Sequence, residues 1–120
     1  LRAVLNYGHT YGHAFEALAG YGGLLHGEAV SIGMICASRL AESLGRITPE
    51  ETRRQKKLLS ELKLPVSVPA ELRDRHEDIV ACMMLDKKTE GRELRFVLPS
   101  RIGHVEIVRG VLPEAAMKCL

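Results

Sequence analysis

The sequence predicts a mainly α-helical domain that contains one short β-hairpin, and three observations predict it. An apolar run over 26–44 and an amphipathic run over 48–62 are both bracketed by residues that start and stop helices. Two later runs, 93–98 and 102–108, alternate apolar and polar residues as short strands do. The 120 residues, of which 46% are hydrophobic and 27% charged, are enough for one domain around one core.

The first two helices are predicted to flank a glycine-rich loop. Residues 1–19 have an apolar side and are predicted to be helical, with 6–8 as a point of interruption. The glycines that break this pattern are Gly20, Gly22 and Gly23. Residues 26–44 are apolar on more than one face, which is typical of a buried central helix, and Gly45 is a suitable residue to end it.

The third helix begins with a capping motif. Thr48 is the predicted N-cap, Pro49 takes the first helical position, and Glu51 completes a capping box. The predicted apolar stripe of this helix is Leu58, Leu59 and Leu62. We interpret its basic residues as a solvated face with a Glu50–Arg54 pair, rather than as an anion site.

The second half of the chain is predicted to consist of short elements. Residues 64–69 are predicted to be extended, 70–75 to form a short helical turn, and 77–85 to form a further helix. The two alternating runs are predicted to pair as a hairpin across 99–103, and Pro113 to start a last short helix.

The composition excludes several classes of protein. The net charge of +2, without a basic stripe interleaved with aromatics, argues against nucleic-acid binding. No apolar run reaches the roughly 18 residues of a membrane span. Three widely spaced cysteines without a CxxC pair indicate free thiols in a reducing, cytoplasmic compartment. Because the chain starts at Leu1 inside an apolar pattern, we interpret it as a segment of a longer protein.

Three of the five histidines lie close together in the sequence, at His9, His13 and His26. On a helix, His9 and His13 are at i and i+4, so both rings leave the same face. His26 follows the glycine loop, which allows its ring to fold back toward that pair. Such a set suits a divalent zinc ion. Spacing alone leaves open the alternative of hydrogen-bonded structural histidines.

Glycines and glutamates accompany these histidines. Gly8, Gly12 and Gly27 are unfavourable in helices, so their presence hints at close packing or at approach of a ligand. Glu16 and Glu28 are candidates for metal ligands, for carboxylates that orient a histidine ring, or for ordinary helix surface.

Three sequence blocks resemble the signature of the 3-dehydroquinate synthases, and the resemblance covers essentially all 120 residues. The first block contains Arg2, Asn6, Gly8-His9-Thr10, Gly12-His13-Ala14 and Glu16. The second block is Leu25-His26-Gly27-Glu28-Ala29-Val30 with Ile32-Gly33-Met34. The third block contains Asp86-Lys87-Lys88, Gly91, Leu94-Arg95-Phe96-Val97-Leu98-Pro99 and Ile102-Gly103. Tyr7 and Tyr11 stand where the family usually has phenylalanine.

The resemblance implies a role for each matched residue. His9 and His26 correspond to two histidine ligands of a catalytic zinc (or cobalt) ion, and His13 to a catalytic residue that contacts substrate near its phosphate. The implied substrate-binding positions are Arg2, Asn6, His13 and one lysine of Lys87 and Lys88, with Lys88 favoured. Arg2 and Asn6 share a face with His9 only if the first helix extends back that far.

The resemblance implies the fold of the helical C-terminal domain of these enzymes over residues 1–120, and an activity for the full-length parent. That activity converts 3-deoxy-D-arabino-heptulosonate 7-phosphate to 3-dehydroquinate and phosphate in the shikimate pathway, with transient oxidation by NAD. The NAD-binding domain and a third zinc ligand, a glutamate, are implied to lie upstream. We therefore expect the segment alone to be inactive, and the full-length enzyme to be a homodimer.

Three alternatives remain open from the sequence. They are a related sugar-phosphate cyclase of the 2-deoxy-scyllo-inosose synthase type, a metal-dependent alcohol dehydrogenase, and a helical interaction domain without catalytic chemistry. The dehydrogenase is disfavoured by the anion site implied at Asp86-Lys87-Lys88.

Overall fold

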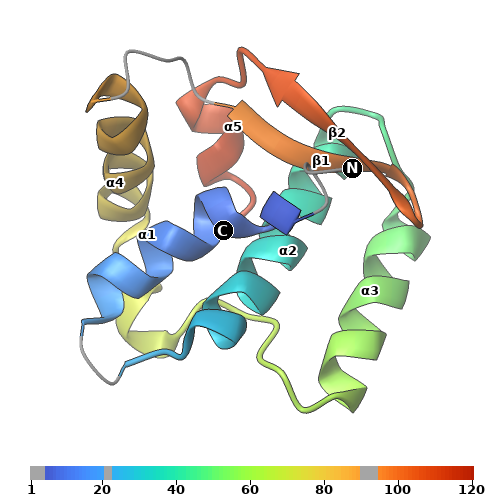
Figure 1. Ribbon diagram of the computed structural model, residues 1–120, viewed down its shortest axis with the longest axis horizontal. Helices are drawn as coiled ribbons and strands as arrows, with labels where there is room; N and C mark the ends of the chain where they lie inside the picture. Colours follow the sequence, from blue (N-terminus) through green and yellow to red (C-terminus); the bar gives the residue numbers. More distant parts are fainter. Residues whose placement is uncertain (1–4, 21–22, 90–94) are drawn as a thin grey trace.

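The fold is mainly helical and includes one two-stranded antiparallel sheet, as the sequence predicts (Figure 1). The computed structural model describes residues 5–20, 23–89 and 95–120, without the side chains of 86–89. The elements are α1 (His9–Ala19), α2 (His26–Ser43), α3 (Pro49–Glu61), the short 3₁₀ helix η2 (Ala70–Leu72), α4 (His76–Thr89), β1 (Arg95–Arg101), β2 (His104–Arg109) and α5 (Pro113–Met117).

Helix α2 is the centre of the structure, and α1, α3, α5 and β1 all pack against it (Figure 1). Its buried residues include Ile32, Ile35 and Leu40, which are at most 1% exposed. The prediction of a buried central helix is therefore confirmed. The helix ends at Ser43, and Gly45 follows with φ +74°, the left-handed conformation that favours glycine after a helix.

Helix α1 is shorter than predicted because its first residue is His9. Gly8 precedes it with φ +82°, a left-handed conformation that stops the helix from continuing backwards. The interruption expected near 6–8 is therefore confirmed within the described residues, and the regular α-helix begins after it. Residues 1–4 and 21–22 lie outside the described residues.

The contact between α1 and α2 depends on glycines at the crossing point. A Cβ atom built at Gly33 would overlap the carbonyl oxygen of Gly8 and lie 2.9 Å from the backbone nitrogen of Gly12. A Cβ atom at Gly8 would lie 2.8 Å from the carbonyl oxygen of Val30. The two backbones can approach this closely only because these positions lack side chains. Gly27 differs, since a Cβ atom there would meet nothing within 4 Å.

Helix α3 has the predicted start but a different surface. Thr48 Oγ1 accepts a hydrogen bond from Glu51 N at 3.3 Å, and Glu51 Oε1 accepts one from Thr48 N at 3.1 Å. The predicted apolar stripe is wrong in part, because Leu59 is buried whereas Leu58 and Leu62 are 57% and 62% exposed. α3 packs mainly on α2, so only the side that faces α2 is covered.

The surface ion pair expected on α3 is formed by another residue. Glu50 pairs with Arg53 at i+3 and not with Arg54 at i+4. Both spacings place side chains on neighbouring turns of one helix face, and sequence spacing alone does not choose between them.

The hairpin is confirmed, with later boundaries than predicted. β1 extends through Pro99 to Arg101, so that the turn lies at 102–103 rather than across 99–103. Phe96 and Leu98 face the core and are at most 1% exposed, as the alternation predicts.

The helices in the second half of the chain also differ in length from the predictions. α4 runs to Thr89, four residues beyond the predicted end at Leu85. The turn expected over 70–75 is present as η2, and Pro113 begins α5 as expected.

Hydrogen bonds through the interior connect the peripheral elements to this framework. Tyr11 is fully buried, and its hydroxyl donates to the carbonyl oxygen of Ala116 at 2.8 Å. The hydroxyl of Ser31 donates to the carbonyl oxygen of Pro65 at 2.6 Å. These bonds satisfy polar groups whose burial would otherwise be costly. Within the residues described, no helix has the length and apolarity needed to cross a bilayer.

We predict that Gly33→Ala destabilises the chain, because the new methyl group overlaps the backbone of Gly8. The expected loss in the free energy of unfolding is about 3 kcal/mol, the upper part of the range for overpacking. Urea denaturation measures it. Gly27→Ala is the matched control, since that position is open and alanine favours a helix by roughly 0.5–1 kcal/mol. Equal stabilities of the two variants would contradict the proposed role of the contact.

We also predict that Cys36 is unreactive in the native chain at pH 8. Burial raises the pKa of the Cys36 thiol to about 12, so the nucleophilic thiolate is scarce at that pH. Iodoacetamide followed by mass spectrometry should show alkylation of Cys36 only after urea is added. Because the native state holds this proton more tightly than the unfolded state, stability should fall between pH 9 and pH 12. Rapid native alkylation would contradict this prediction.

Candidate metal and substrate site

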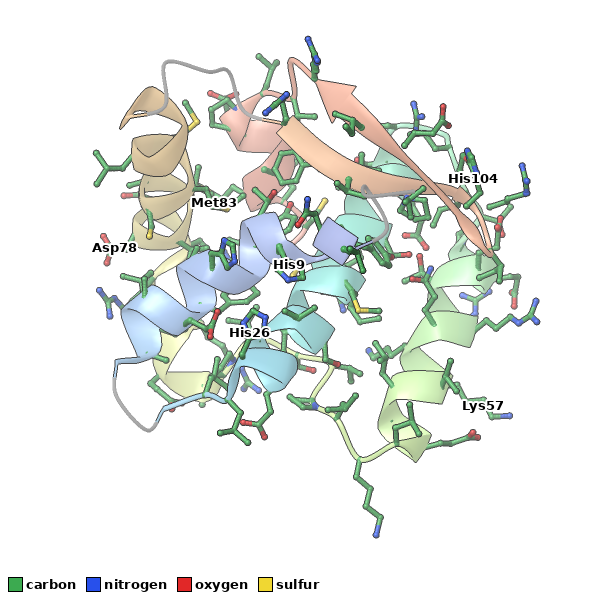
Figure 2. All side chains as sticks on the ribbon, in the orientation of Figure 1. His9, His26, Lys57, Asp78, Met83 and His104 are labelled. Carbon is green, nitrogen blue, oxygen red and sulfur yellow. The ribbon has the colours of Figure 1, made fainter. Side chains whose placement is uncertain are left out.

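The rings of His9 and His26 lie together between α1 and the first turn of α2 (Figure 2), and the ring of His13 lies beside them. The centroid of the His9 ring is 5.4 Å from that of the His13 ring and 5.3 Å from that of the His26 ring. The centroids of His13 and His26 are 6.4 Å apart. His9 and His13 stand one turn apart on α1, as their spacing requires. The glycine contact between the two helices places His26 beside them.

His26 is held by a carboxylate from the other helix. Its Nδ1 atom lies 3.1 Å from Oε2 of Glu16 in α1. Glu16 is three residues after His13 and seven after His9, so the three side chains form one stripe along α1. A carboxylate accepts hydrogen bonds, so Nδ1 of His26 is the donor, and the lone pair of the neutral ring is on Nε2.

His9 is held in the same tautomer by the backbone. Its Nδ1 atom lies 3.3 Å from the carbonyl oxygen of Tyr7. A carbonyl oxygen can only accept, so Nδ1 donates and Nε2 of His9 is also free to act as a ligand. The left-handed turn at Gly8 separates these two residues and allows the chain to reverse onto the ring.

The pair His9 and His26 fits part of a metal site. Two imidazoles bound through Nε2 to one tetrahedral zinc ion have ring centroids roughly 5 Å apart, given Zn–N bonds of about 2.1 Å. The observed separation of 5.3 Å agrees with this arrangement. Among the residues that the structure describes, no three His, Cys, Asp or Glu side chains are arranged to hold a metal ion.

His13 differs from His9 in its surroundings. It is exposed, as His26 is, whereas His9 is half-buried, and it occupies the next turn of α1. An exposed imidazole beside two potential ligands is able to donate a hydrogen bond to an anionic group that approaches the same face. This placement is compatible with the substrate contact expected for His13.

The other predicted site residues are only partly within the described structure. Asn6 is exposed in the turn before α1, and the condition for sharing a helix face with His9 is not met, because α1 begins at His9. Arg2 lies outside the described residues. Lys87 and Lys88 lie in the last turn of α4, which packs against α1, and their side chains are not described.

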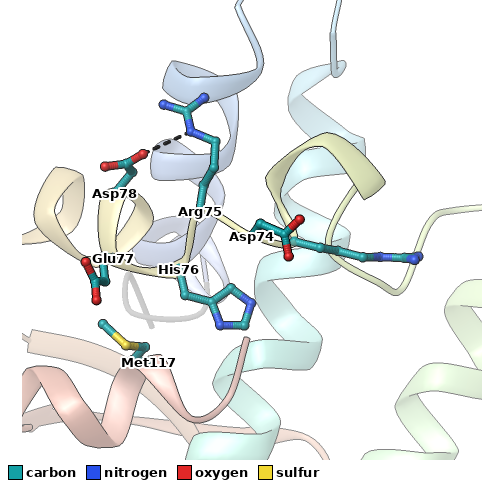
Figure 3. Close-up of a pocket in the computed structure, with 7 residues that line it drawn as sticks. Asp74, Arg75, His76, Glu77, Asp78 and Met117 are labelled. Carbon is teal, nitrogen blue, oxygen red and sulfur yellow. Dashed lines mark hydrogen bonds and ion pairs between the residues drawn. The ribbon is translucent and has the colours of Figure 1, made fainter.

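A concave region lies at the start of α4. Its volume is about 350 Å³, and it is lined by the charged segment 73–78 together with Met117 (Figure 3). Within it, Nε of Arg75 and Oδ2 of Asp78 form an ion pair at 3.0 Å. None of the three clustered histidines lines this region. It is therefore separate from the candidate metal site.

Some contacts near the site were not predicted from the sequence. The hydroxyl of Tyr7 contacts Gln55 Oε1, Gln55 Nε2 donates to Ser38 Oγ, and Ser38 in turn bonds the Thr52 hydroxyl. Desolvation by burial raises the pKa of Tyr7, which keeps the hydroxyl protonated. The polar residues of α3 form no pattern that would have revealed this network.

The role of Glu28, left open from the sequence, is capping of α2. Its Oε1 atom accepts from the backbone nitrogen of Leu25 at 3.0 Å. Of the two candidate glutamates, Glu16 contacts a histidine ring, whereas Glu28 contacts the backbone of Leu25. The sequence spacing could have indicated this difference, because Glu16 lies on the same face of α1 as His9 and His13, whereas Glu28 lies on α2.

Sequence comparisons agree with the resemblance. The family model described as 3-dehydroquinate synthase C-terminal matches residues 1–89. A 3-dehydroquinate synthase of Geobacter metallireducens is 51% identical over 109 residues, which are 91% of this chain and 29% of the relative. The corresponding enzyme of Crocosphaera subtropica is 45% identical over 120 residues, all of this chain and 32% of the relative. The chain thus spans about a third of the length of these relatives.

Structural comparisons point to related cyclases. ValA, a 2-epi-5-epi-valiolone synthase of Streptomyces hygroscopicus with NAD⁺ and Zn²⁺ bound, matches with a TM-score of 0.80 and 28% identity, over 96% of this chain and 31% of that one. A 2-deoxy-scyllo-inosose synthase complexed with carbaglucose-6-phosphate, NAD⁺ and Co²⁺ matches with a TM-score of 0.69 and 25% identity, over 97% of this chain and 32% of that one.

Proposed function

The chain belongs to the 3-dehydroquinate synthase family, and we propose that it is the C-terminal metal- and substrate-binding part of such an enzyme. The full-length protein would convert 3-deoxy-D-arabino-heptulosonate 7-phosphate to 3-dehydroquinate and phosphate. The observation that supports this most strongly is the meeting of His9, His13 and His26 at one crossing of two helices. We use the term full-length protein for these residues preceded by the remainder of the chain found in the relatives.

In this proposal, His9 and His26 hold a divalent cation through Nε2. Their Nδ1 atoms are engaged by Tyr7 and Glu16, so each ring is already in the tautomer that a metal requires. The third ligand comes from the preceding part of the chain. The cation, zinc or cobalt, would supply Lewis-acid polarisation of the substrate oxygens where NAD removes and returns hydride.

The remaining residues bind and orient the substrate. His13, exposed next to the metal-binding pair, would donate a hydrogen bond near the phosphate group. Arg2 would hold an anionic group through its planar fork, and Lys88, or Lys87, through a point charge. Asn6, in the turn before α1, would contribute amide hydrogen bonds. NAD would be bound mainly by the preceding domain, and the homodimeric state stays a prediction.

A second candidate is a sugar-phosphate cyclase with a different substrate, because the matched structures include a 2-epi-5-epi-valiolone synthase and a 2-deoxy-scyllo-inosose synthase. The higher identity to 3-dehydroquinate synthases, 51% against 28%, favours the first assignment. Incubation of the full-length protein with either the heptulosonate phosphate or D-glucose 6-phosphate distinguishes the two. Turnover of the hexose phosphate alone would replace the first assignment by the second.

We predict that the full-length protein forms 3-dehydroquinate and that the 120-residue chain alone does not. In the full-length protein, His9→Ala or His26→Ala is expected to lower kcat by at least about 100-fold. The expected loss exceeds the range for residues that only support a metal ligand. Release of phosphate and dehydroquinate measures turnover. His104→Ala, an exposed histidine on β2, is the matched control. Unchanged turnover in both site variants would favour a helical interaction domain without catalytic chemistry.

We further predict that the 120-residue chain by itself binds zinc only weakly, with a dissociation constant in the micromolar range or higher. Two imidazoles form an incomplete ligand set, and structural or catalytic zinc sites have at least three protein ligands. Isothermal titration calorimetry measures this affinity. Sub-micromolar binding that is abolished by His9→Ala would show that the chain contains a complete site.

A further inference from the structure

The contact between His26 and Glu16 lies at the surface of the molecule. The Nδ1–Oε2 distance is 3.1 Å, and the side chains are 59% and 31% exposed. Exposed ion pairs contribute little to folding, because water screens them and ordering the side chains costs entropy. Stabilisation of the fold is therefore a weak explanation for this pair, and the orientation of the ring is a better one.

The chemistry of the acceptor determines the state of the ring. A carboxylate places the ring proton of neutral His26 on Nδ1 and leaves the Nε2 lone pair available. His9 is in the same state, because its Nδ1 atom faces the Tyr7 carbonyl oxygen at 3.3 Å. The two rings, with centroids 5.3 Å apart, therefore both keep the Nε2 lone pair available.

We propose that Glu16 is a positioning residue, which holds His26 in the Nδ1–H tautomer with Nε2 presented to the metal ion. This inference rests on the proposed function, in which His26 is a ligand. Carboxylates in this position generally raise the affinity of a histidine for its metal by 10–100-fold. The ring of His9 needs no such side chain, since the backbone performs the same task.

The chain offers a matched control for this role. Glu28 has the same charge and lies two residues after His26, but its carboxylate caps α2 through Leu25 N at 3.0 Å. Glutamine maintains that cap, because an amide oxygen also accepts a hydrogen bond. Glu28→Gln thus removes one negative charge near the histidines without removing the partner of His26.

The experiment compares Glu16→Ala, Glu16→Gln and Glu28→Gln in the full-length protein. Cobalt and zinc affinities are measured by competition with a chelator. We expect Glu16→Ala to bind about 10–100-fold more weakly, Glu16→Gln to recover part of this loss through its amide oxygen, and Glu28→Gln to equal the unmodified protein. In the metal-free protein, ¹⁵N spectra of labelled histidine at pH 8 should show His26 as Nδ1–H, and a shift toward Nε2–H in Glu16→Ala.

The outcomes separate this inference from the proposed function. Equal metal affinity in Glu16→Ala and Glu28→Gln would overturn it, as would a loss of affinity in Glu16→Ala with the His26 tautomer unchanged. Both readouts are independent of which substrate is turned over. A full-length protein that makes no dehydroquinate, yet shows the tautomer shift and the loss of cobalt binding, would reject the proposed function and support the role of Glu16. Should Glu16→Ala fail to fold, weaker cobalt binding in Glu16→Gln than in Glu28→Gln supports the role, and equal binding overturns it.

Discussion

The close approach of α1 to α2 is the contact on which the candidate site depends. Gly33 on α2 leaves room for the carbonyl of Gly8 and the backbone nitrogen of Gly12, so the two helix backbones touch directly. With side chains at these positions, the helices would be held further apart. His9 and His26 come from different helices, and the separation of their rings is set by this backbone contact rather than by the histidines themselves.

The rest of the structure keeps that crossing in place. Tyr11, on the opposite side of α1 from the histidines, is fully buried and bonded to Ala116 in α5. A series of hydrogen bonds connects the residues before α1 to α2 and α3. It runs through the side chains of Tyr7, Gln55, Ser38 and Thr52. Buried hydrogen bonds of this kind are directional, so they specify how the elements are oriented in addition to holding them together.

The two potential metal ligands are prepared in different ways. His9 is oriented by a backbone carbonyl and His26 by a side-chain carboxylate, yet both present the same ring nitrogen. A ring whose tautomer is already set loses less freedom when a cation binds. Among the described residues no three His, Cys, Asp or Glu side chains are arranged to hold an ion, and the relatives are about three times as long as this chain.

The sequence by itself determined those features that depend on neighbouring residues along the chain. The cap at Thr48, the buried character of α2, the hairpin alternation around Phe96, and the common face of His9 and His13 all follow from local stereochemistry. Only the tertiary structure decided that His26 reaches His9, that Glu16 rather than Glu28 contacts a histidine, and that Leu58 stays exposed. The physical reason is that local patterns specify which face of a helix is apolar, whereas the partner of that face depends on where two helices cross, and here the crossing is set by backbone contact at glycines.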